Sequence, residues 1–176
     1  MPSRKRTACY WILGTILFLS ALLSFWPSLV PVAWYVTHKH EASFRGLSLT
    51  VPLGWRPDFV DATSHEFTLR KPPLSTFQDK YYQTITFSSL PVTWDSKMPY
   101  SDRKQYMSLA FRSNDWSDVT QQSIAVNKII CTSGHPKEDS KMIHANCLVP
   151  GAGVLAEFNG ASRDMPEFIA VLKGLH

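Results

Sequence analysis

The stretch "GVLAEFNGASRDMPEFIAVLKGL", residues 153–175, decides the expected fold because it joins a strand pattern directly to a helix pattern. Its first part, Val154 to Asn159, has the composition of a half-buried β-strand. In its second part the apolar residues recur at helical spacing and form one face, made of Met165, Phe168, Ile169 and Leu172. We therefore expect a strand followed by a terminal amphipathic helix that packs on the sheet.

The start of this helix has its own signature. Asp164 precedes Glu167 by three residues, the spacing of a capping box, in which side chains bind backbone N–H groups of the first turn. Pro166 fits the first turn because its missing N–H has no helical partner there. The sequence thus predicts a helix that begins at Asp164 and is capped by two acidic residues.

Further segments have strand composition and end at clusters of Pro, Gly, Asp or Ser; they are 44–51, 65–70, 84–90, 123–131 and 142–149. Short connections, such as the turn expected at Gly151 to Gly153, favour antiparallel pairing. A second helix is expected after Ser101, its N-cap, since Tyr106, Leu109 and Ala110 recur at helical spacing. Strands in runs predict an α+β fold, a mostly antiparallel sheet with helices packed on it. A pure β-sandwich is the alternative if the second helix does not form.

The segment "LSLTVPLGWRPDF", Leu47 to Phe59, starts as a strand and stops abruptly. Pro52 and Gly54 break its alternation and turn the chain. Trp55 lies inside this break, where a large ring serves either recognition at the surface or coverage of the core. We expect Trp55 to fold back over the core.

These two ends resemble the PsbP-like family of α/β/α sandwich domains, which includes extrinsic photosystem subunits and bacterial exported proteins of the DcrB and LpqN kind. The resemblance rests on "LSLTVPLGWRP", a strand ending in Pro-x-Gly-Trp, and on the strand and terminal helix of residues 153–175. Between Phe67 and Val149 the chain contributes only a compatible order of elements. The resemblance implies a non-catalytic binding or assembly domain at a membrane surface, and it brings no catalytic residues with it.

An uncharged segment from Ala8 to Val36 is long enough to be a membrane anchor. As one straight helix it would measure about 43 Å, against roughly 30 Å of hydrocarbon in a bilayer. Pro27 offers a break, so that Ala8 to Trp26 spans about 28 Å and the remainder, with Trp34 and Tyr35, forms an interfacial exit segment. A cleaved secretory signal is the alternative, but the apolar run is long for one, and no small-x-small cleavage site lies between positions 20 and 43.

Charge sets the orientation of the anchor and argues against nucleic acid as a partner. Arg4, Lys5 and Arg6 are three of the 18 basic residues, so 15 basic residues face 14 acidic ones from position 7 onward. A nucleic-acid footprint would need basic residues gathered on the folded domain. By the positive-inside rule the basic tail stays in the cytoplasm and everything after Thr37 is outside.

The expected organisation is therefore that of a single-pass protein of the cell membrane. It comprises a cytoplasmic tail (1–7), the transmembrane anchor with its exit segment (8–36), a linker (37–43) and an extracytoplasmic α+β domain (44–176). In a Gram-negative cell this domain would be periplasmic.

Export also determines how the cysteines are interpreted. Cys131 and Cys147 would lie in an oxidising space, where a pair of cysteines tends to form a disulfide. The bond would close a loop of about 15 residues and contribute about 3 kcal/mol in the chain-entropy model. Two buried free thiols are the alternative. Cys9 lies before the apolar run instead of after it, which argues against attachment of a lipid as in bacterial lipoproteins.

Candidate metal and catalytic residues are few. His38 and His40 could share a metal ion, but no third ligand accompanies them and the intervening Lys39 repels a cation, so no metal site is expected. His65 and Glu66 are neighbours on a strand and point to opposite faces. No short motif of a hydrolase, a phosphate-binding loop or a dinucleotide fold is present, so we expect no cofactor and no enzyme. Distant Ser, His and Asp residues can still meet in space as a triad.

Aromatic residues in or beside the expected loops serve either recognition or the edge of the core; they are Trp55, Tyr81, Tyr82, Trp94, Tyr100 and Trp116. A partner surface is first expected in the polar loop "KPPLSTFQDKYYQ", residues 71–83. The expected function is to bind a protein partner, or to help assemble a membrane complex, through an anchored domain. The alternative is an exported carrier of a small molecule or lipid, or a hydrolase with its site in a cleft.

Overall fold

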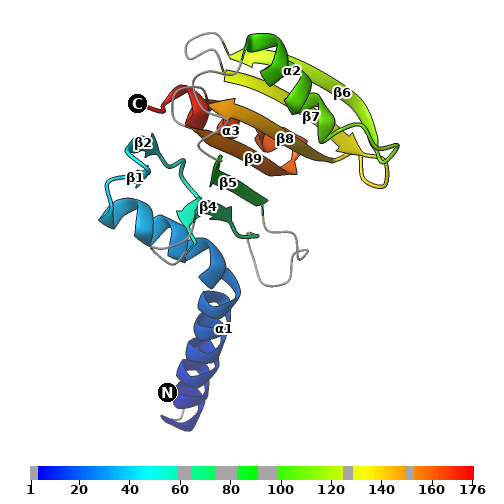
Figure 1. The fold of residues 1–176 in the computed structure, drawn as a ribbon. Helices are drawn as coiled ribbons and strands as arrows, with labels where there is room; N and C mark the ends of the chain where they lie inside the picture. The colour runs from blue at the N-terminus through cyan, green and yellow to red at the C-terminus, as the bar shows by residue number, and fades with distance from the viewer. Residues whose placement is uncertain (1–3, 59–64, 74–82, 91–98, 125–128, 150–152) are drawn as a thin grey trace.

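The computed structural model describes residues 4–58, 65–73, 83–90, 99–124, 129–149 and 153–176. A long helix, α1 (Arg4–Thr37), leads into a two-stranded hairpin, β1 (Glu41–Phe44) and β2 (Leu47–Thr50). The other strands form one sheet in the order β3-β4-β5-β9-β8-β7-β6. Their bounds are β3 (Arg56–Pro57), β4 (Glu66–Lys71), β5 (Gln83–Ser89), β6 (Trp116–Ile124), β7 (Ile129–Pro136), β8 (Met142–Val149) and β9 (Val154–Ala161). Helices α2 (Tyr100–Leu109) and α3 (Met165–Lys173) pack on this sheet (Figure 1), and the 3₁₀ turn η2 (Ser162–Asp164) leads into α3.

Every strand pairing among the described residues is antiparallel. This confirms the predicted α+β class, a mostly antiparallel sheet with helices packed on it. β8 has the predicted bounds, while β4 and β5 are each shifted by one residue from the prediction. The strand predicted over residues 123–131 is wrong, because that range holds the end of β6 and the start of β7. Most of β6 went unrecognised because its side chains are largely polar and exposed, so apolar alternation is missing.

The predicted strand from Phe44 to Val51 is also wrong, since it begins inside a hairpin. Phe44 pairs with Leu47, and the two residues between them, Arg45 and Gly46, have φ angles of 51° and 82°. A two-residue turn with both φ angles positive matches the twist of its flanking strands, and glycine adopts this conformation without steric cost. The other edge of β2 pairs with the end of the chain, where Ser48 N donates to His176 O at 2.8 Å.

Helix α1 continues through Pro27 and Pro31, so the prediction that it breaks at Pro27 is wrong. It bends near its middle instead (Figure 1), because a proline inside a helix removes one hydrogen bond and displaces the preceding turn. Beyond the bend Pro31 is buried and Trp34 packs against the core of the domain. The helix ends where Lys39 and His40 take left-handed conformations, with φ angles of 52° and 54°.

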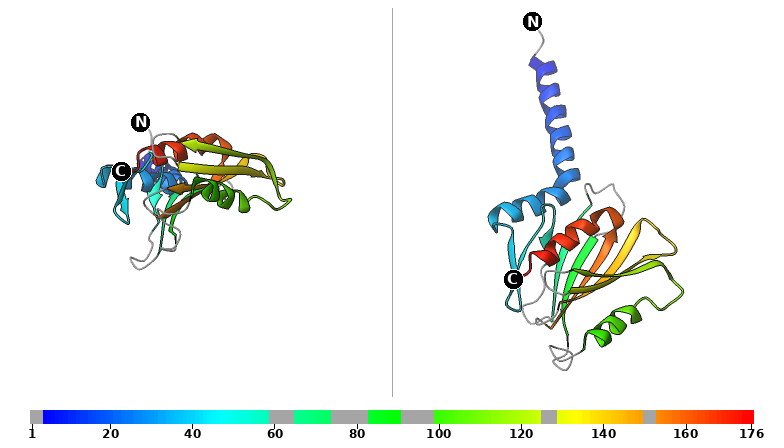
Figure 2. Two further views of the ribbon diagram at one scale, coloured as in Figure 1. Left: turned by 45° about the horizontal axis from the view of Figure 1, so that its top comes forward. Right: turned by 90° about the horizontal axis from the view of Figure 1, so that it is seen from above.

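Helices α2 and α3 cover opposite faces of the sheet. Neighbouring residues on a strand point to opposite faces, and Ile130 and Leu148 cluster with Met107 of α2. Cys131 and Cys147 belong instead to the larger core beneath α3. That core is completed by the hairpin and by the second half of α1. It buries the central strands of one sheet face, while α2 packs on β7 and β8 of the other. Figure 2 shows α2 at the end of the domain remote from the first half of α1.

The two cysteines of the predicted disulfide face each other in register on β7 and β8. Their sulfur atoms are 2.04 Å apart, and both side chains are completely buried. The bridge therefore joins the two strands inside the core, on the face that α3 covers.

The starts of the two short helices differ from the predicted caps. The N-cap of α2 is Pro99, and Ser101 donates its hydroxyl to Asp102 Oδ1 at 3.0 Å instead of capping the helix. Asp164 precedes α3 as predicted, but its side chain makes no capping hydrogen bond. Asp164 and Glu167 both bind Lys71 Nζ on β4, at 3.0 and 2.9 Å, because a partly buried ammonium ion is a stronger partner than a backbone N–H.

Replacing Trp55 with alanine tests its place in the core. Trp55 is completely buried, lies 6.4 Å from the ring of Phe158 and donates Nε1–H to Glu167 at 2.6 Å. Trp55→Ala should lower the free energy of unfolding by about 3–5 kcal/mol, measured by denaturant unfolding of the full chain in detergent. Leu53→Ala is the matched control, because Leu53 is in the same turn and 62% exposed. Equal stability of both variants would contradict the structural role of Trp55.

Candidate functional site

Apart from the two bonded cysteines, the described residues that the sequence singles out do not form one site. His38 and His40 stack on different rings, those of Trp34 and Tyr35, with centroids 4.9 and 5.0 Å apart. Within the described part of the chain no group of three His, Cys, Asp or Glu residues could hold a metal ion. Trp55 is buried, whereas Tyr81, Tyr82, Trp94 and most of the polar loop 71–83 lie outside the described residues. For Tyr100 only the backbone, at the start of α2, is described.

A serine and a histidine do come together, but not as a catalytic pair. Ser162 Oγ lies 3.5 Å from His135 Nδ1. The serine hydroxyl already donates to Lys141 O at 2.9 Å, and His135 Nδ1 donates to Met142 O at 2.8 Å. A general base must present a free nitrogen lone pair to the nucleophile. In this arrangement Nδ1 carries the proton and cannot accept one from Ser162. The hydrogen bonds of the two side chains instead join the β7–β8 turn to the end of β9.

The cluster around Lys71 is structural as well. Its ammonium group is bound by Asp164 and Glu167 and lies 5.7 Å from the ring centroid of Trp55. Burial by itself would raise the pKa of Asp164, but the hydrogen bonds from Lys71 and Gln83 and the nearby positive charges lower it overall. The ionised carboxylate therefore stabilises the folded protein, as expected for an ion pair that fastens α3 to the sheet.

The strongest candidate site is a groove of about 350 Å³ between α2 and the sheet face opposite α3. It is lined by Tyr106, Met107, Leu109 and Ala110 from α2 and the residue after it, by Asn146 from β8, and by Leu155 and Glu157 from β9. Its walls are thus mostly apolar, and two polar side chains stand opposite each other on its floor, where Asn146 pairs with Glu157 in register. We call this feature the α2 groove.

A row of polar residues crosses the sheet through this floor. In strand order the row is Gln121, Thr132, Asn146, Glu157, Thr86 and Thr68. The side chains at both ends of the row form hydrogen bonds with their neighbours. At one end Gln121 Nε2 donates to Thr132 Oγ1 and to Lys104 O. At the other end the hydroxyls of Thr68 and Thr86 are 3.3 Å apart. The middle of the row is different, because Asn146 Oδ1 is buried and, among the described residues, has no hydrogen-bond partner.

Glu157 is held in an unfavourable environment for a charge. Burial raises its pKa above the ordinary value, and the negative charge of Glu66 on β4 raises it further. Among the described residues Glu157 forms no ion pair. A half-buried carboxylate whose charge its surroundings disfavour is typical of a binding or functional site.

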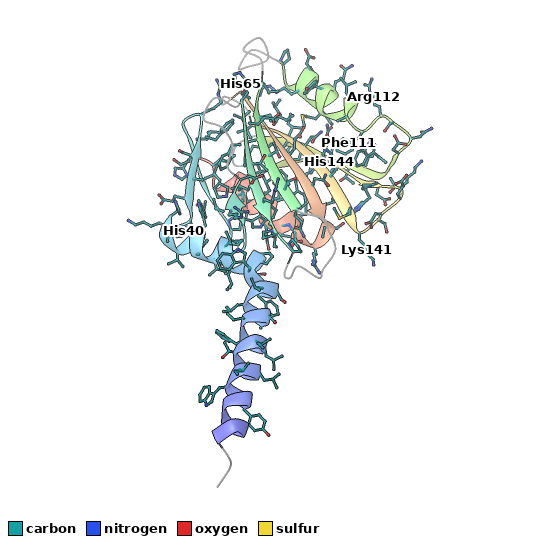
Figure 3. The ribbon with its side chains drawn as sticks, turned by 90° about the horizontal axis from the view of Figure 1, so that it is seen from below. His40, His65, Phe111, Arg112, Lys141 and His144 are labelled. Carbon is teal, nitrogen blue, oxygen red and sulfur yellow. A yellow bond between two sulfur atoms is a disulfide. The ribbon has the colours of Figure 1, made fainter. Side chains whose placement is uncertain are left out.

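An aromatic cluster adjoins the groove just beyond α2. The rings of Phe111, Trp116 and His144 lie with centroids 5.0 to 5.7 Å apart, and Figure 3 shows Phe111 beside His144. Phe111 packs over Gly134, where an added Cβ would come within 3.1 Å of the ring. Burial lowers the pKa of His144, and the nearby Asn146 side chain only partly opposes this. His144 and Asn146 Oδ1 nevertheless form no hydrogen bond of good geometry.

The α2 groove can accept hydrogen bonds and balance a positive charge, but it offers no activated nucleophile. An ionised carboxylate is an acceptor only, and the free atom of Asn146 is its carbonyl oxygen. The sequence interpretation overlooked both residues. The available signal was a glutamate between the apolar residues of "VLAEF", since a charge in the middle of a strand that is otherwise buried is unusual.

Comparisons with known proteins identify neither a family nor a function for the chain. No protein-family model matches the chain, and no curated protein matches it.

Replacing Glu157 with glutamine tests whether its charge costs stability. A raised pKa means that the folded protein holds the proton more tightly than the unfolded chain, so stability falls as the pH rises through the pKa of Glu157. The Glu157→Gln protein should lack this fall and melt at a higher temperature than wild type at about pH 7, but not at about pH 4. Thermal unfolding of both proteins in detergent at the two pH values measures this difference in melting temperature. Glu138→Gln, on the exposed β7–β8 turn, should show no such gain. A lower melting temperature for Glu157→Gln at pH 7 would contradict the assignment.

Proposed function

We propose that this chain is a membrane-anchored extracytoplasmic accessory protein whose α+β domain binds a protein partner at the membrane surface. The PsbP-like resemblance of the two ends of the domain implies the same role. Helices on opposite faces of an antiparallel sheet, as α2 and α3 are placed here, agree with such a sandwich. No cofactor takes part in the proposal.

The observation that carries the proposal is the packing of the anchor into the domain. Residues Tyr10–Thr37 are long and apolar enough to cross a membrane. Yet the second half of the same helix buries Pro31 and places Trp34 against the core. A helix attached in this way holds the domain close to the bilayer, which raises its effective concentration near a membrane-bound partner. A flexible linker would only tether the domain.

The position of the α2 groove agrees with binding in the aqueous space. Figure 2 and Figure 3 place α2 at the far end of the domain from the first half of α1. If that half crosses the bilayer, α2 and the groove beside it lie at the end of the domain away from the lipid surface. A protein that approaches the domain from the aqueous side can reach it.

The alternatives have less support. A carrier needs an enclosed apolar cavity, whereas the largest side chains of the described core, such as Trp55, Phe158 and Phe168, are completely buried against one another. A hydrolase needs a nucleophile beside a free base, and the hydrogen bonds of Ser162 and His135 leave no such arrangement between them.

Thiol labelling tests the compartment. Protein from membranes, unfolded without reductant, should take up one alkyl group, on Cys9, and the reduced protein should take up three, because the chain has three cysteines. The disulfide also lowers the mass of the unlabelled protein by about two daltons relative to its reduced form. Three alkyl groups before reduction would contradict export of the domain, since thiols in the cytoplasm stay reduced.

Affinity capture tests the partner. The full chain, extracted from its native membrane in mild detergent after brief crosslinking, should bring down one protein in a constant ratio. The Trp55→Ala protein is the control, because it keeps the anchor but destabilises the domain, and it should lose the partner. A solitary monomer recovered from several mild detergents would argue against an accessory role.

A further inference from the structure

The floor of the α2 groove carries two hydrogen-bond acceptors, the carboxylate of Glu157 and the side-chain oxygen of Asn146. Asn146 is 7% exposed, and its Oδ1 has no hydrogen-bond partner among the described residues. A buried acceptor without a partner is costly, and such atoms in folded proteins are usually satisfied by a ligand or by water. Glu157 stands opposite, in a position where Cβ atoms of paired residues are about 5 Å apart. An occupant that brings hydrogen-bond donors would satisfy both acceptors.

The charge of the groove selects a cation. Glu157 and Glu66 are close enough for their charges to oppose each other, and burial adds to the cost of ionising Glu157. A positively charged group beside Glu157 would remove both penalties. A metal ion is a poor fit, because within the described residues no three ligands converge.

The apolar side chains that line the groove favour a cation carried on a chain of methylene groups. Leu155, Met107 and Leu109 surround the two polar residues, and Leu109 is 46% exposed at the mouth. Lysine and arginine bury their methylene stems along apolar surface while the charged end reaches polar partners. A volume of about 350 Å³ is enough for one such side chain and the backbone on either side of it.

We propose that the α2 groove binds a lysine or arginine side chain presented by the protein partner, with Glu157 as the counter-charge and Asn146 Oδ1 as a second acceptor. The inference rests on the proposed function, which supplies a protein as the occupant. A lipid amine is disfavoured because the groove lies at the end of the domain away from the first half of α1.

Methyl-labelled full-length protein in detergent micelles provides the test. A capped tripeptide with a central lysine should shift the methyl signals of Leu155, Leu109 and Met107 in a saturable way. The same peptide with an Nε-acetylated lysine should bind at least about tenfold more weakly, because acetylation removes the charge. Equal binding of the two peptides would overturn the proposal. Tighter binding of spermidine than of the lysine peptide would also overturn it, since the ligand would then be a small polyamine.

Two variants separate the role of Glu157 from a change in general charge. Glu157→Gln should lower the affinity for the lysine peptide by about tenfold or more. The methyl signals of the variant outside the groove should remain those of the folded protein. Glu138→Gln removes the same charge from an exposed turn and should leave the affinity unchanged. Equal losses in both variants would show a nonspecific charge effect and contradict the site.

The same variant distinguishes this inference from the proposed function. If wild-type protein captures a partner and Glu157→Gln captures it equally well, the accessory role stands and the lysine site is wrong. If no partner is captured although the peptide binds at Leu155 and Leu109, the site stands as a cation site and the accessory role is wrong.

Discussion

The structure depends on the burial of the central strands on one face of the sheet. The central strands β5, β9, β8 and β7 direct most of their large apolar side chains to that face, where Phe87, Phe158, Cys147 and Cys131 are fully buried. Helix α3 covers them through Phe168 and Leu172, and the disulfide lies within the same layer. Since hydrophobic burial supplies most of the stability of a small domain, the other elements are placed by what this layer leaves uncovered.

This buried layer has two consequences, one at the end of the domain next to the anchor and one on the opposite face of the sheet. At one end the layer extends beyond α3, and it is completed by the β1–β2 hairpin and by Trp34 of α1, so the anchor becomes part of the fold. On the opposite face α2 packs mainly on β7 and β8, and the floor beside it carries Asn146 and Glu157. The two groups of acidic residues differ accordingly. Asp164 is paired with Lys71 and stabilises the fold, whereas Glu157 carries a charge that the fold alone does not favour.

The sequence predicts the elements that have strong apolar patterns. β8 is recognisable because apolar residues alternate with His144 and Asn146 in its sequence, and α3 because its apolar residues recur at the period of a helix. β6 is not, because an exposed edge strand such as "SDVTQQS" has no buried face to produce the pattern. The helical course of α1 through Pro27 and the use of Asp164 as an ion-pair partner depend on tertiary contacts, with the core and with Lys71, that lie outside any local window. The α2 groove was overlooked for the same reason, since its residues come from α2, β8 and β9.

If the domain meets a protein partner at the α2 groove, as we propose, a crosslinker at the mouth of the groove should capture that partner. Site-specific photocrosslinking in intact membranes tests it most directly, with a benzophenone amino acid placed at Leu109, at the mouth of the groove, or at Leu53, which is exposed elsewhere on the domain. The account predicts one discrete crosslinked protein from position 109, lost when Glu157→Gln is added, and none from position 53. Crosslinks of equal yield from both positions, or crosslinks at 109 that persist with Glu157→Gln, would contradict it.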